Sequence, residues 1–247
     1  MDNLIYVALT GINQAERLQT VVSHNLANVS TTGYRAEVPV FDSAEILGDG
    51  LESRVNSVEV AQDWNDAAGA LVPTGETLDL AIRGSGWFAV LDAQGNEAYT
   101  RSGSFRLSST GLLETKSGEL VLGESGPISL PQSQEIYIGG DGLISIVPIG
   151  QDANTLVETD RLKLVNPTKD EIERYSDGLF RSTSELPLPA DPSVQVVSGQ
   201  LESSNVNVSE ALVQMIEIAR HFETQVKALR VAEENDQAAS SVMQVNS

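Results

Sequence analysis

The chain has 247 residues, of which 40% are hydrophobic, and a formal net charge of −20. This length and apolar content allow a sizeable buried core and favour more than one folded unit. Because the chain contains no cysteine, a disulfide framework, a thiolate metal site and a cysteine nucleophile are all excluded.

The first residues do not resemble a cleavable signal peptide. Met1-Asp2-Asn3-Leu4 carries an acid where a signal peptide carries Lys or Arg, and no apolar block leads to a small-residue cleavage site. No apolar run in the chain approaches the roughly 18 residues that a bilayer-spanning helix needs. We therefore expect no direct membrane insertion, and either a cytosolic protein or one exported with its N-terminus intact.

The N-terminal segment carries a narrow apolar stripe with steps of three and four residues, interrupted only at Gln19. The members of this stripe are Ile5, Ala8, Ile12, Ala15, Val22, Leu26 and Val29. Heptad spacing of this kind predicts a helix that packs against another helix. We expect the helix to end within residues 28–33, where polar side chains can bond their own backbone and Gly33 can adopt a positive φ.

The middle of the chain has the alternating pattern of β-strands. A short extended stretch is predicted at residues 38–41, and strands are predicted at residues 87–91, 119–122, 135–138, 143–146 and 161–165. Gly-containing hairpin loops are predicted at residues 92–96, 109–111, 116–118 and 139–142. This spacing predicts an antiparallel meander or a small open barrel. Residues 185–197 contain three prolines and are expected to be extended or loop-like.

A second apolar stripe lies near the C-terminus. Its members are Leu212, Met215, Ala219, Phe222, Val226 and Leu229. A helix over about residues 208–243 would be ~54 Å long at ~1.5 Å per residue, which a small compact domain could hardly enclose. Either Asn207, in a capping box with Glu210, or Ser209 can cap its N-terminus.

Amide side chains lie beside both predicted helix termini. Asn25, Asn28 and Asn205 can each cap backbone groups or bridge to a neighbouring subunit. Together with Gly33 and Asn207, they form a predicted helix-terminus motif.

These elements predict an α+β fold in which the N- and C-terminal helices form a discontinuous coiled-coil unit and a central, mainly antiparallel β domain is inserted between them. The expected parts are an N-terminal helix with its terminating loop, an extended connection, the β domain, a return linker and a C-terminal helix, at residues 1–35, 36–77, 78–184, 185–207 and 208–247. The two stripes can pair with each other or with neighbouring copies, which favours assembly over a catalytic pocket. The alternative is that the stripes pack only on the protein's own core.

The charge is concentrated between the two helical segments. Residues 1–35 contain two acidic and two basic side chains, and residues 209–247 contain six acidic and three basic ones. By difference, residues 36–208 carry −17 of the net −20. Such a surface repels phosphates and helps to keep unassembled copies apart, so no nucleic-acid partner is expected. A merely solvated acidic surface is the alternative interpretation.

No pattern in the chain predicts catalysis, a cofactor or a metal. His24 and His221 both fall in predicted helices without ligand spacing. Residues 84–86 (Gly-Ser-Gly) lack the Lys-Ser/Thr of a phosphate loop. Asp141-Gly142 and Asp177-Gly178 read as turns rather than calcium loops.

Four segments, in order, resemble the flagellar rod and hook axial proteins. His24-Asn25-Leu26-Ala27-Asn28-Val29-Ser30-Thr31-Thr32-Gly33-Tyr34-Arg35 resembles their NLANVNTTGF signature, with His24 where Asn is usual and Tyr34 where Phe is common. The other three segments are residues 78–90 with 99–105, residues 199–207, which match the pattern G-x-L-E-x-S-N-V, and residues 215–223. Further strings at residues 1–6, 33–36, 126–128, 161–165 and 177–181 are similar to those of a proximal rod subunit, and a distal rod or hook-type subunit is the close alternative.

The resemblance implies a structural role. A member of this family is expected to pass unfolded through the flagellar export apparatus without a cleavable signal, and to assemble in the periplasmic rod of the basal body. Its terminal helices would line the channel wall and transmit torque, and its partners would be other copies of itself and other rod proteins, proximal and distal.

Two other classes of protein fit the sequence less well. A secreted glycan-binding β module would need an aromatic platform, for which Trp64 and Trp87 are too few and too far apart. A hydrolase with acidic catalytic residues would need a carboxylate pair, which no local pattern indicates.

Overall fold

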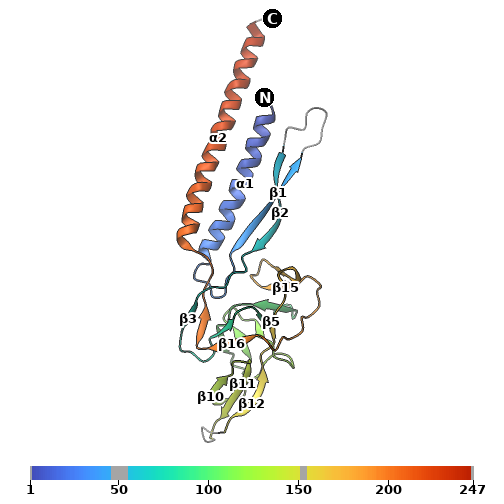
Figure 1. The fold of residues 1–247 in the computed structure, drawn as a ribbon, viewed down its shortest axis with the longest axis vertical. Helices are drawn as coiled ribbons and strands as arrows, with labels where there is room; N and C mark the ends of the chain where they lie inside the picture. Colours follow the sequence, from blue (N-terminus) through green and yellow to red (C-terminus); the bar gives the residue numbers. More distant parts are fainter. Residues whose placement is uncertain (1, 46–54, 151–154, 246–247) are drawn as a thin grey trace. The chain divides into compact units, whose positions relative to one another are not determined.

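The computed structural model describes residues 2–45, 55–150 and 155–245. It has two long helices, α1 (Asp2–Ala27) and α2 (Val208–Val245), and the part of the sequence that connects them forms β-strands (Figure 1). The predicted α+β class is confirmed. By its contacts the chain divides into two compact units. The helical unit comprises residues 1–29, 36–65 and 206–247, and the β unit comprises residues 30–35 and 66–205.

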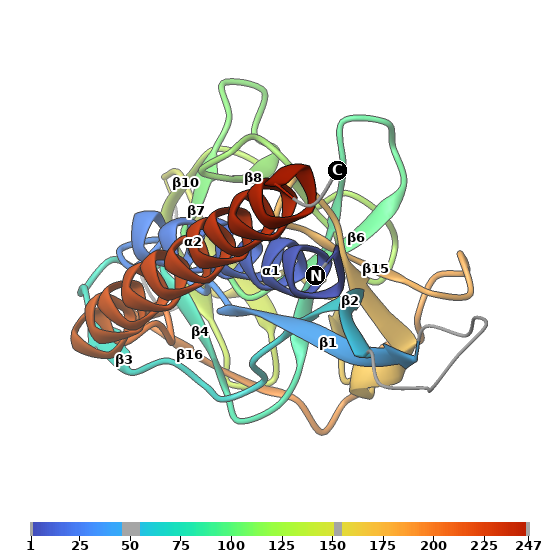
Figure 2. The same cartoon turned by 90° about the horizontal axis from the view of Figure 1, so that it is seen from above.

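In the helical unit, α1 and α2 lie side by side in antiparallel directions, and a hairpin lies along α1 (Figures 1 and 2). The hairpin consists of β1 (Glu37–Glu45) and β2 (Val55–Trp64), with a register shift between Val40 and Phe41. Residues 36–65 therefore belong with the helices, whereas the sequence suggested only an extended connection over residues 36–77.

Both helix termini are held by the amides that the sequence indicated. Asn28 Nδ2 donates to the His24 carbonyl over 3.0 Å, at the C-terminal end of α1. Asn207 Oδ1 accepts hydrogen bonds from the N–H groups of Ser209 and Glu210, at 3.0 and 3.4 Å. These bonds occupy backbone groups that a helix end otherwise leaves unsatisfied.

The strands of the β unit pair only in antiparallel fashion. The main sheet has the order β14-β15-β6-β5-β9-β8-β7, with β13 also paired to β5. Its strands are β5 (Trp87–Leu91), β6 (Glu97–Thr100), β7 (Phe105–Leu107), β8 (Leu113–Thr115), β9 (Leu120–Val121), β13 (Leu164–Val165), β14 (Ile172–Arg174) and β15 (Phe180–Ser182). A 3₁₀ turn, η1 (Lys169–Glu171), precedes β14.

Three smaller sheets complete the β unit. They have the orders β10-β11-β12, β16-β4 and β17-β3. Their strands are β3 (Leu71–Pro73), β4 (Leu80–Arg83), β10 (Ser133–Ile138), β11 (Leu143–Pro148), β12 (Val157–Arg161), β16 (Gln195–Ser198) and β17 (Gln200–Glu202).

Most of the predicted strands and all four predicted hairpin loops are found. The strand expected over residues 161–165 is instead divided between the end of β12 and β13. The segment expected to be a return linker, residues 185–207, supplies β16 and β17. These two strands pair with β4 and β3, more than a hundred residues earlier in the chain, and local patterning does not report such distant partners.

The core of the β unit draws apolar side chains from β4, β5, β6, β7, β8, β9, β11, β13 and β16, and from the loops between strands. Leu80, Phe88, Val90, Leu113 and Ile144 are completely buried in it. The rings of Phe88 and Phe105 meet edge to face with centroids 5.1 Å apart, an arrangement that aromatic pairs prefer. All members of this core lie within the β unit, which is consistent with a division into two units.

Candidate functional site

The predicted apolar stripe of α1 lies largely against its neighbours in the helical unit. Of its members, Ala8, Ala15 and Val22 are buried and Ile5, Ile12, Leu26 and Val29 are half-buried. A Cβ on Gly11 would lie only 2.9 Å from the Gln225 side chain of α2, so the two helices approach closely where α1 has no side chain. Small residues at this face allow that approach.

The predicted stripe of α2 is only partly covered within the chain. Met215, Val226 and Leu229 are half-buried, whereas Leu212, Ala219 and Phe222 are exposed. The side that α2 buries is marked instead by Ala211 and Ala232, with Ile218, Gln225 and Ala228 half-buried between them. The positions Ala211, Ile218, Gln225 and Ala232 repeat every seven residues, so the line of contact keeps the heptad spacing but lies one residue before the predicted positions 212, 219 and 226.

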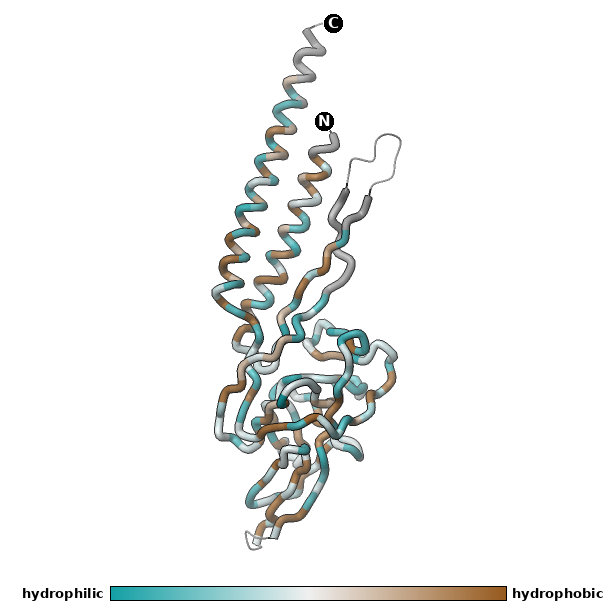
Figure 3. Tube along the Cα trace, in the orientation of Figure 1, coloured by the Kyte–Doolittle hydropathy of each residue, from teal (hydrophilic) through white to brown (hydrophobic). Residues whose placement is uncertain are grey.

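Large apolar side chains remain exposed on both helices. Figure 3 shows hydrophobic positions recurring between hydrophilic ones along them. The exposed members are Tyr6, Val7 and Leu9 on α1 and Val208, Leu212, Val213, Ile216, Phe222 and Val231 on α2. We call these residues the exposed apolar face. Most of them lie outside the predicted stripes. The sequence indicated them only in that each helix carries more apolar residues than contact with one partner helix requires.

A polar contact fixes the end of α1 to the start of β1. Asn25 Nδ2 donates to the Glu37 carbonyl over 2.9 Å, and the Glu37 N–H donates to Asn25 Oδ1 over 2.8 Å. His24 Nδ1 lies 2.9 Å from Glu37 Oε2. Asn25 therefore forms a strand-like pair with the backbone rather than a helix cap.

A buried charged cluster lies in the β unit and contains Arg35, Arg101 and Glu202; we call it the junction cluster. Arg35 Nη2 lies 2.8 Å from Glu202 Oε1, at ion-pair distance but without hydrogen-bond alignment. Arg101 Nη1 donates to Glu202 Oε2 over 3.2 Å. All three side chains are at most 5% exposed. Removing one partner from such a buried set leaves a charge without compensation.

The cluster holds two cations and one anion. Burial lowers the pKa of the Arg101 guanidinium to about 10; Glu202 acts in the opposite direction and Arg35 lowers the pKa further. Arg101 still carries its charge at neutral pH. It also donates to the Gly84 carbonyl over 2.7 Å and lies over the Trp87 ring, 5.5 Å from its centroid. These contacts compensate in part for removing the guanidinium from water.

Two glycines allow backbone segments around the junction cluster to approach one another closely. The Gly33 N–H donates to the Glu202 carbonyl over 2.8 Å, and the Gly69 N–H donates to Glu202 Oε1 over 2.9 Å. A Cβ on Gly33 would lie 2.4 Å from the backbone carbon of Arg101, and one on Gly69 would lie 1.9 Å from the Ser203 carbonyl oxygen. Only glycine fits at these two contacts.

Sequence reasoning included Gly33 and Asn205 as helix-terminus residues but missed the three charged residues. Asn205 Nδ2 donates to the Ala67 carbonyl over 2.8 Å, within the β unit. The charged residues lie in three of the four segments that carry the family resemblance: residues 24–35, 99–105 and 199–207. In each of these three segments a charged residue stands among apolar or turn-forming residues. This pattern could have indicated the three residues from the sequence.

A second charged group in the β unit surrounds Arg181. Its Nη2 lies 2.8 Å from Asp92 Oδ2 and 2.6 Å from Asp177 Oδ2. Burial opposes ionisation of Asp92, but the hydrogen bonds from Arg181 and from the N–H groups of Asn96 and Gln94 outweigh it and lower the pKa of this carboxyl. The group ties β15 to the loop between β5 and β6, a structural role.

The residues that could take part in metal binding do not come together in the described part of the chain. No group of three His, Asp or Glu side chains there is arranged to hold a metal ion. His24 and His221 are both exposed on helices. No described helix has the length and apolar content of a membrane span.

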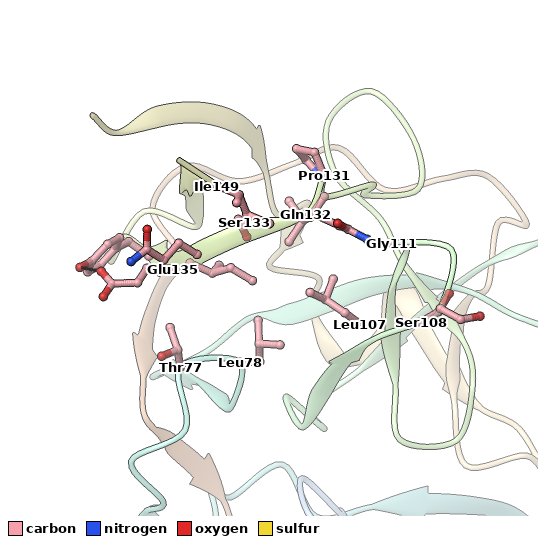
Figure 4. Close-up of a pocket in the computed structure, with 15 residues that line it drawn as sticks. Thr77, Leu78, Leu107, Ser108, Gly111, Pro131, Gln132, Ser133, Glu135 and Ile149 are labelled. Atoms are coloured by element: carbon pink, nitrogen blue, oxygen red, sulfur yellow. Dashed lines mark hydrogen bonds between the residues drawn. The ribbon is translucent and has the colours of Figure 1, made fainter. Parts of the chain in front are cut away.

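A pocket of about 790 Å³ in the β unit lies between β10 and the segments that contain Leu78 and Leu107 (Figure 4). Glu135 and Tyr137 supply its only ionisable side chains, and the Tyr137 hydroxyl donates to the Glu135 carboxylate. General acid–base chemistry near neutral pH needs a group that titrates there. This lining provides no histidine or lysine for that purpose.

Three family models match the chain. The model described as "Flagella basal body rod protein" matches residues 5–35, "Flagellar hook protein FlgE/F/G D1 domain" matches residues 81–146, and "Flagellar basal body rod FlgEFG protein C-terminal" matches residues 197–242. The first and third cover α1 and most of α2, and the second covers much of the β unit.

Full-length relatives agree with these matches. The flagellar basal-body rod proteins FlgF of Escherichia coli (strain K12) and Salmonella typhimurium (strain LT2) are each 38% identical to the chain over 252 residues, with all of both chains covered. The flagellar basal-body rod protein FlgG of Buchnera aphidicola (from Acyrthosiphon pisum) is 32% identical over 261 residues, which cover 96% of this chain and 98% of that relative.

Proposed function

The chain belongs to the FlgF family of flagellar basal-body rod proteins and is a structural subunit of the rod; on this premise we propose that it forms part of the proximal rod and assembles there through its terminal helices. In this proposal α1 and α2 act as a coiled-coil unit, form the wall of the export channel with neighbouring subunits and transmit torque. The partners are further copies of this chain and other rod proteins.

The observation that carries the proposal is the exposed apolar face of the helical unit. Leu212 is 47% exposed, Ile216 54% and Tyr6 58%. Full burial of an exposed Leu or Ile is worth about 1.5–3 kcal/mol, so an interface that covers Leu212 or Ile216 gains about half of that. A series of such side chains along two helices suits burial against other helices. Within the chain, neither the partner helix nor the β1–β2 hairpin covers these side chains fully.

The export route expected for the family is consistent with the composition of this chain. We propose that it reaches the periplasmic rod by passing unfolded through the flagellar export apparatus, without a cleavable signal peptide. A chain without cysteine cannot form incorrect disulfides in an oxidising compartment. A distal rod or hook-type subunit is the alternative within the family. The 38% identity to the FlgF proteins of Escherichia coli and Salmonella typhimurium, against 32% to the FlgG protein of Buchnera aphidicola, favours the proximal rod.

The proposal is tested by recovery of the tagged chain in purified basal bodies. Wild-type chain is expected in the rod fraction, and Ile216→Asp is expected to be lost from it because a buried carboxylate would be unpaired at the interface. Gln214→Asp is the matched control, since Gln214 is an exposed polar residue of the same helix and receives the same charge. Recovery of the wild type only from cytosol or medium, or equal recovery of both variants, contradicts the proposal.

A further inference from the structure

The chain passes between the helical unit and the β unit four times, at residues 29/30, 35/36, 65/66 and 205/206. The residues of the β unit at these crossings are Ser30, Arg35, Asp66 and Asn205. They come from three segments far apart in the sequence. The β unit must therefore bring these segments together if the four connections are to leave it in a defined arrangement.

Direct bonds within the β unit join the three segments. The Asn205 N–H donates to the Tyr34 carbonyl over 3.3 Å, which joins the last connection to the first segment. Asn205 Nδ2 and Arg35 Nη1 both donate to the Ala67 carbonyl, which joins these two segments to the middle one.

Glu202 contacts both of the other segments, residues 30–35 and the segment that begins at residue 66. Its carbonyl accepts from Gly33, three residues after the first crossing. Its carboxylate accepts from Gly69, three residues after the third crossing, and from Arg101, and lies beside Arg35. Glu202 itself lies three residues before the last crossing and its side chain is 1% exposed. A buried carboxylate with several charge-assisted contacts is held in one geometry, because each lost contact would leave a charge uncompensated.

We infer that Glu202 is a positioning residue for rod assembly: it holds together the three segments of the β unit from which the four connections to the helical unit leave. This inference rests on the proposed function, and it assigns to the junction cluster a role beyond stability of the β unit. Arg35 lies beside Glu202 Oε1 and Arg101 donates to Oε2, and both serve the same role by compensating and orienting the carboxylate.

The test separates positioning from stability with matched variants of the full chain. Glu202→Gln removes the charge at nearly constant shape, and Glu202→Asp keeps the charge on a side chain one methylene shorter. A core variant outside the cluster, Val121→Ala or Leu113→Ala, is chosen to match Glu202→Gln in unfolding midpoint; both side chains are completely buried. Glu76→Gln, at an exposed carboxylate, controls for loss of one negative charge.

Two readouts are taken under conditions in which the β unit of every variant is folded. The first is amide hydrogen exchange at Gly33, Gly69 and Asn205, which we expect to be at least tenfold faster in Glu202→Gln and unchanged in the core variant. The second is recovery in purified basal bodies from cells that lack the native copy. Here we expect at least a fivefold loss for Glu202→Gln, an intermediate loss for Glu202→Asp and normal recovery of the core and Glu76 variants.

The inference is overturned if exchange at the three amides is the same in Glu202→Gln as in the wild type, or if the core variant is lost from basal bodies as strongly as Glu202→Gln. Absence of the wild type from basal bodies is a different result, because it refutes the rod function itself. In that case the exchange readout still decides whether Glu202 holds the connections.

Discussion

Gly33 combines a positive φ with a close backbone contact, and replacing it with alanine measures what that contact contributes. Gly33 has φ +67°, and an added Cβ would lie 2.4 Å from the Arg101 carbonyl carbon, 2.5 Å from the Ser102 nitrogen and 2.6 Å from the Arg101 oxygen. These are backbone atoms that cannot rotate away. The segment must therefore move by about 1 Å to reach ordinary contact distance, which disrupts the 2.8 Å bond from the Gly33 N–H to Glu202.

Gly75 provides the matched control. It has φ +80°, and nothing lies within 4 Å of the position of its Cβ. Alanine there meets only the left-handed backbone cost of about 1–2 kcal/mol, offset by about 0.4–1 kcal/mol from the less flexible unfolded chain. We expect Gly75→Ala to lower the free energy of unfolding by about 1 kcal/mol. Gly33→Ala adds a disrupted buried hydrogen bond of about 1–3 kcal/mol, for a total of about 3 kcal/mol.

Urea unfolding monitored by tryptophan fluorescence measures the difference. The chain has two tryptophans, the buried Trp64 in the helical unit and the buried Trp87 in the β unit. In a Trp64→Phe background the emission reports on the β unit alone. Equal losses of unfolding free energy for Gly33→Ala and Gly75→Ala, at unchanged urea dependence, would refute the close-contact argument.

Three further results are expected. Leu26→Asp and Val226→Asp should each abolish recovery of the chain in basal bodies while the Trp87 emission of the β unit stays native; normal motility of both mutants would argue strongly against assembly through these helices. Asp92→Asn should lower the free energy of unfolding by about 2 kcal/mol at pH 7, the contribution of a charged hydrogen bond. The pKa of Asp92 is depressed in the folded state, so its contribution to stability is present above the ordinary carboxyl pKa of about 3.9 and is lost as the pH falls through the folded pKa. Plots of unfolding free energy against pH for wild type and Asp92→Asn should therefore converge in acid. A constant gap down to pH 2 would contradict this. Leu113→Ala should cost about 2–5 kcal/mol in urea unfolding, because Leu113 is completely buried in the β-unit core, and a loss below 1 kcal/mol would mean that the site collapses around the cavity.

The helices could be predicted because their signals are local. Heptad spacing and polar residues at the termini predicted α1 and α2, with α2 beginning at Val208 as expected. Hairpins between neighbouring strands were found for the same reason, since a Gly-containing loop and two alternating segments lie within about fifteen residues of one another. The roles of Ile5, Leu26 and the other stripe residues in assembly stay predictions.

The side of each helix that faces its partner could not be read from the sequence alone. Ala211 and Ala232 are buried, while Leu212 is exposed, although leucine is much the more hydrophobic residue. Packing of two helices favours small side chains where the backbones are closest. Where the backbones are closest depends on the relative rotation of the helices, and this is a property of the pair.

The sequence by itself determined the family, the fold class, the two helices and most of the hairpins, because each of these depends on residues close together in the chain. Tertiary structure alone decided that residues 36–65 join the helices, that residues 195–202 return to pair with β3 and β4, and that Glu202 meets Arg35 and Arg101. The physical reason is that a buried carboxylate is stable only where cations and N–H donors surround it. Here those groups come from segments more than a hundred residues away from Glu202 in the sequence, and no local pattern encodes their meeting.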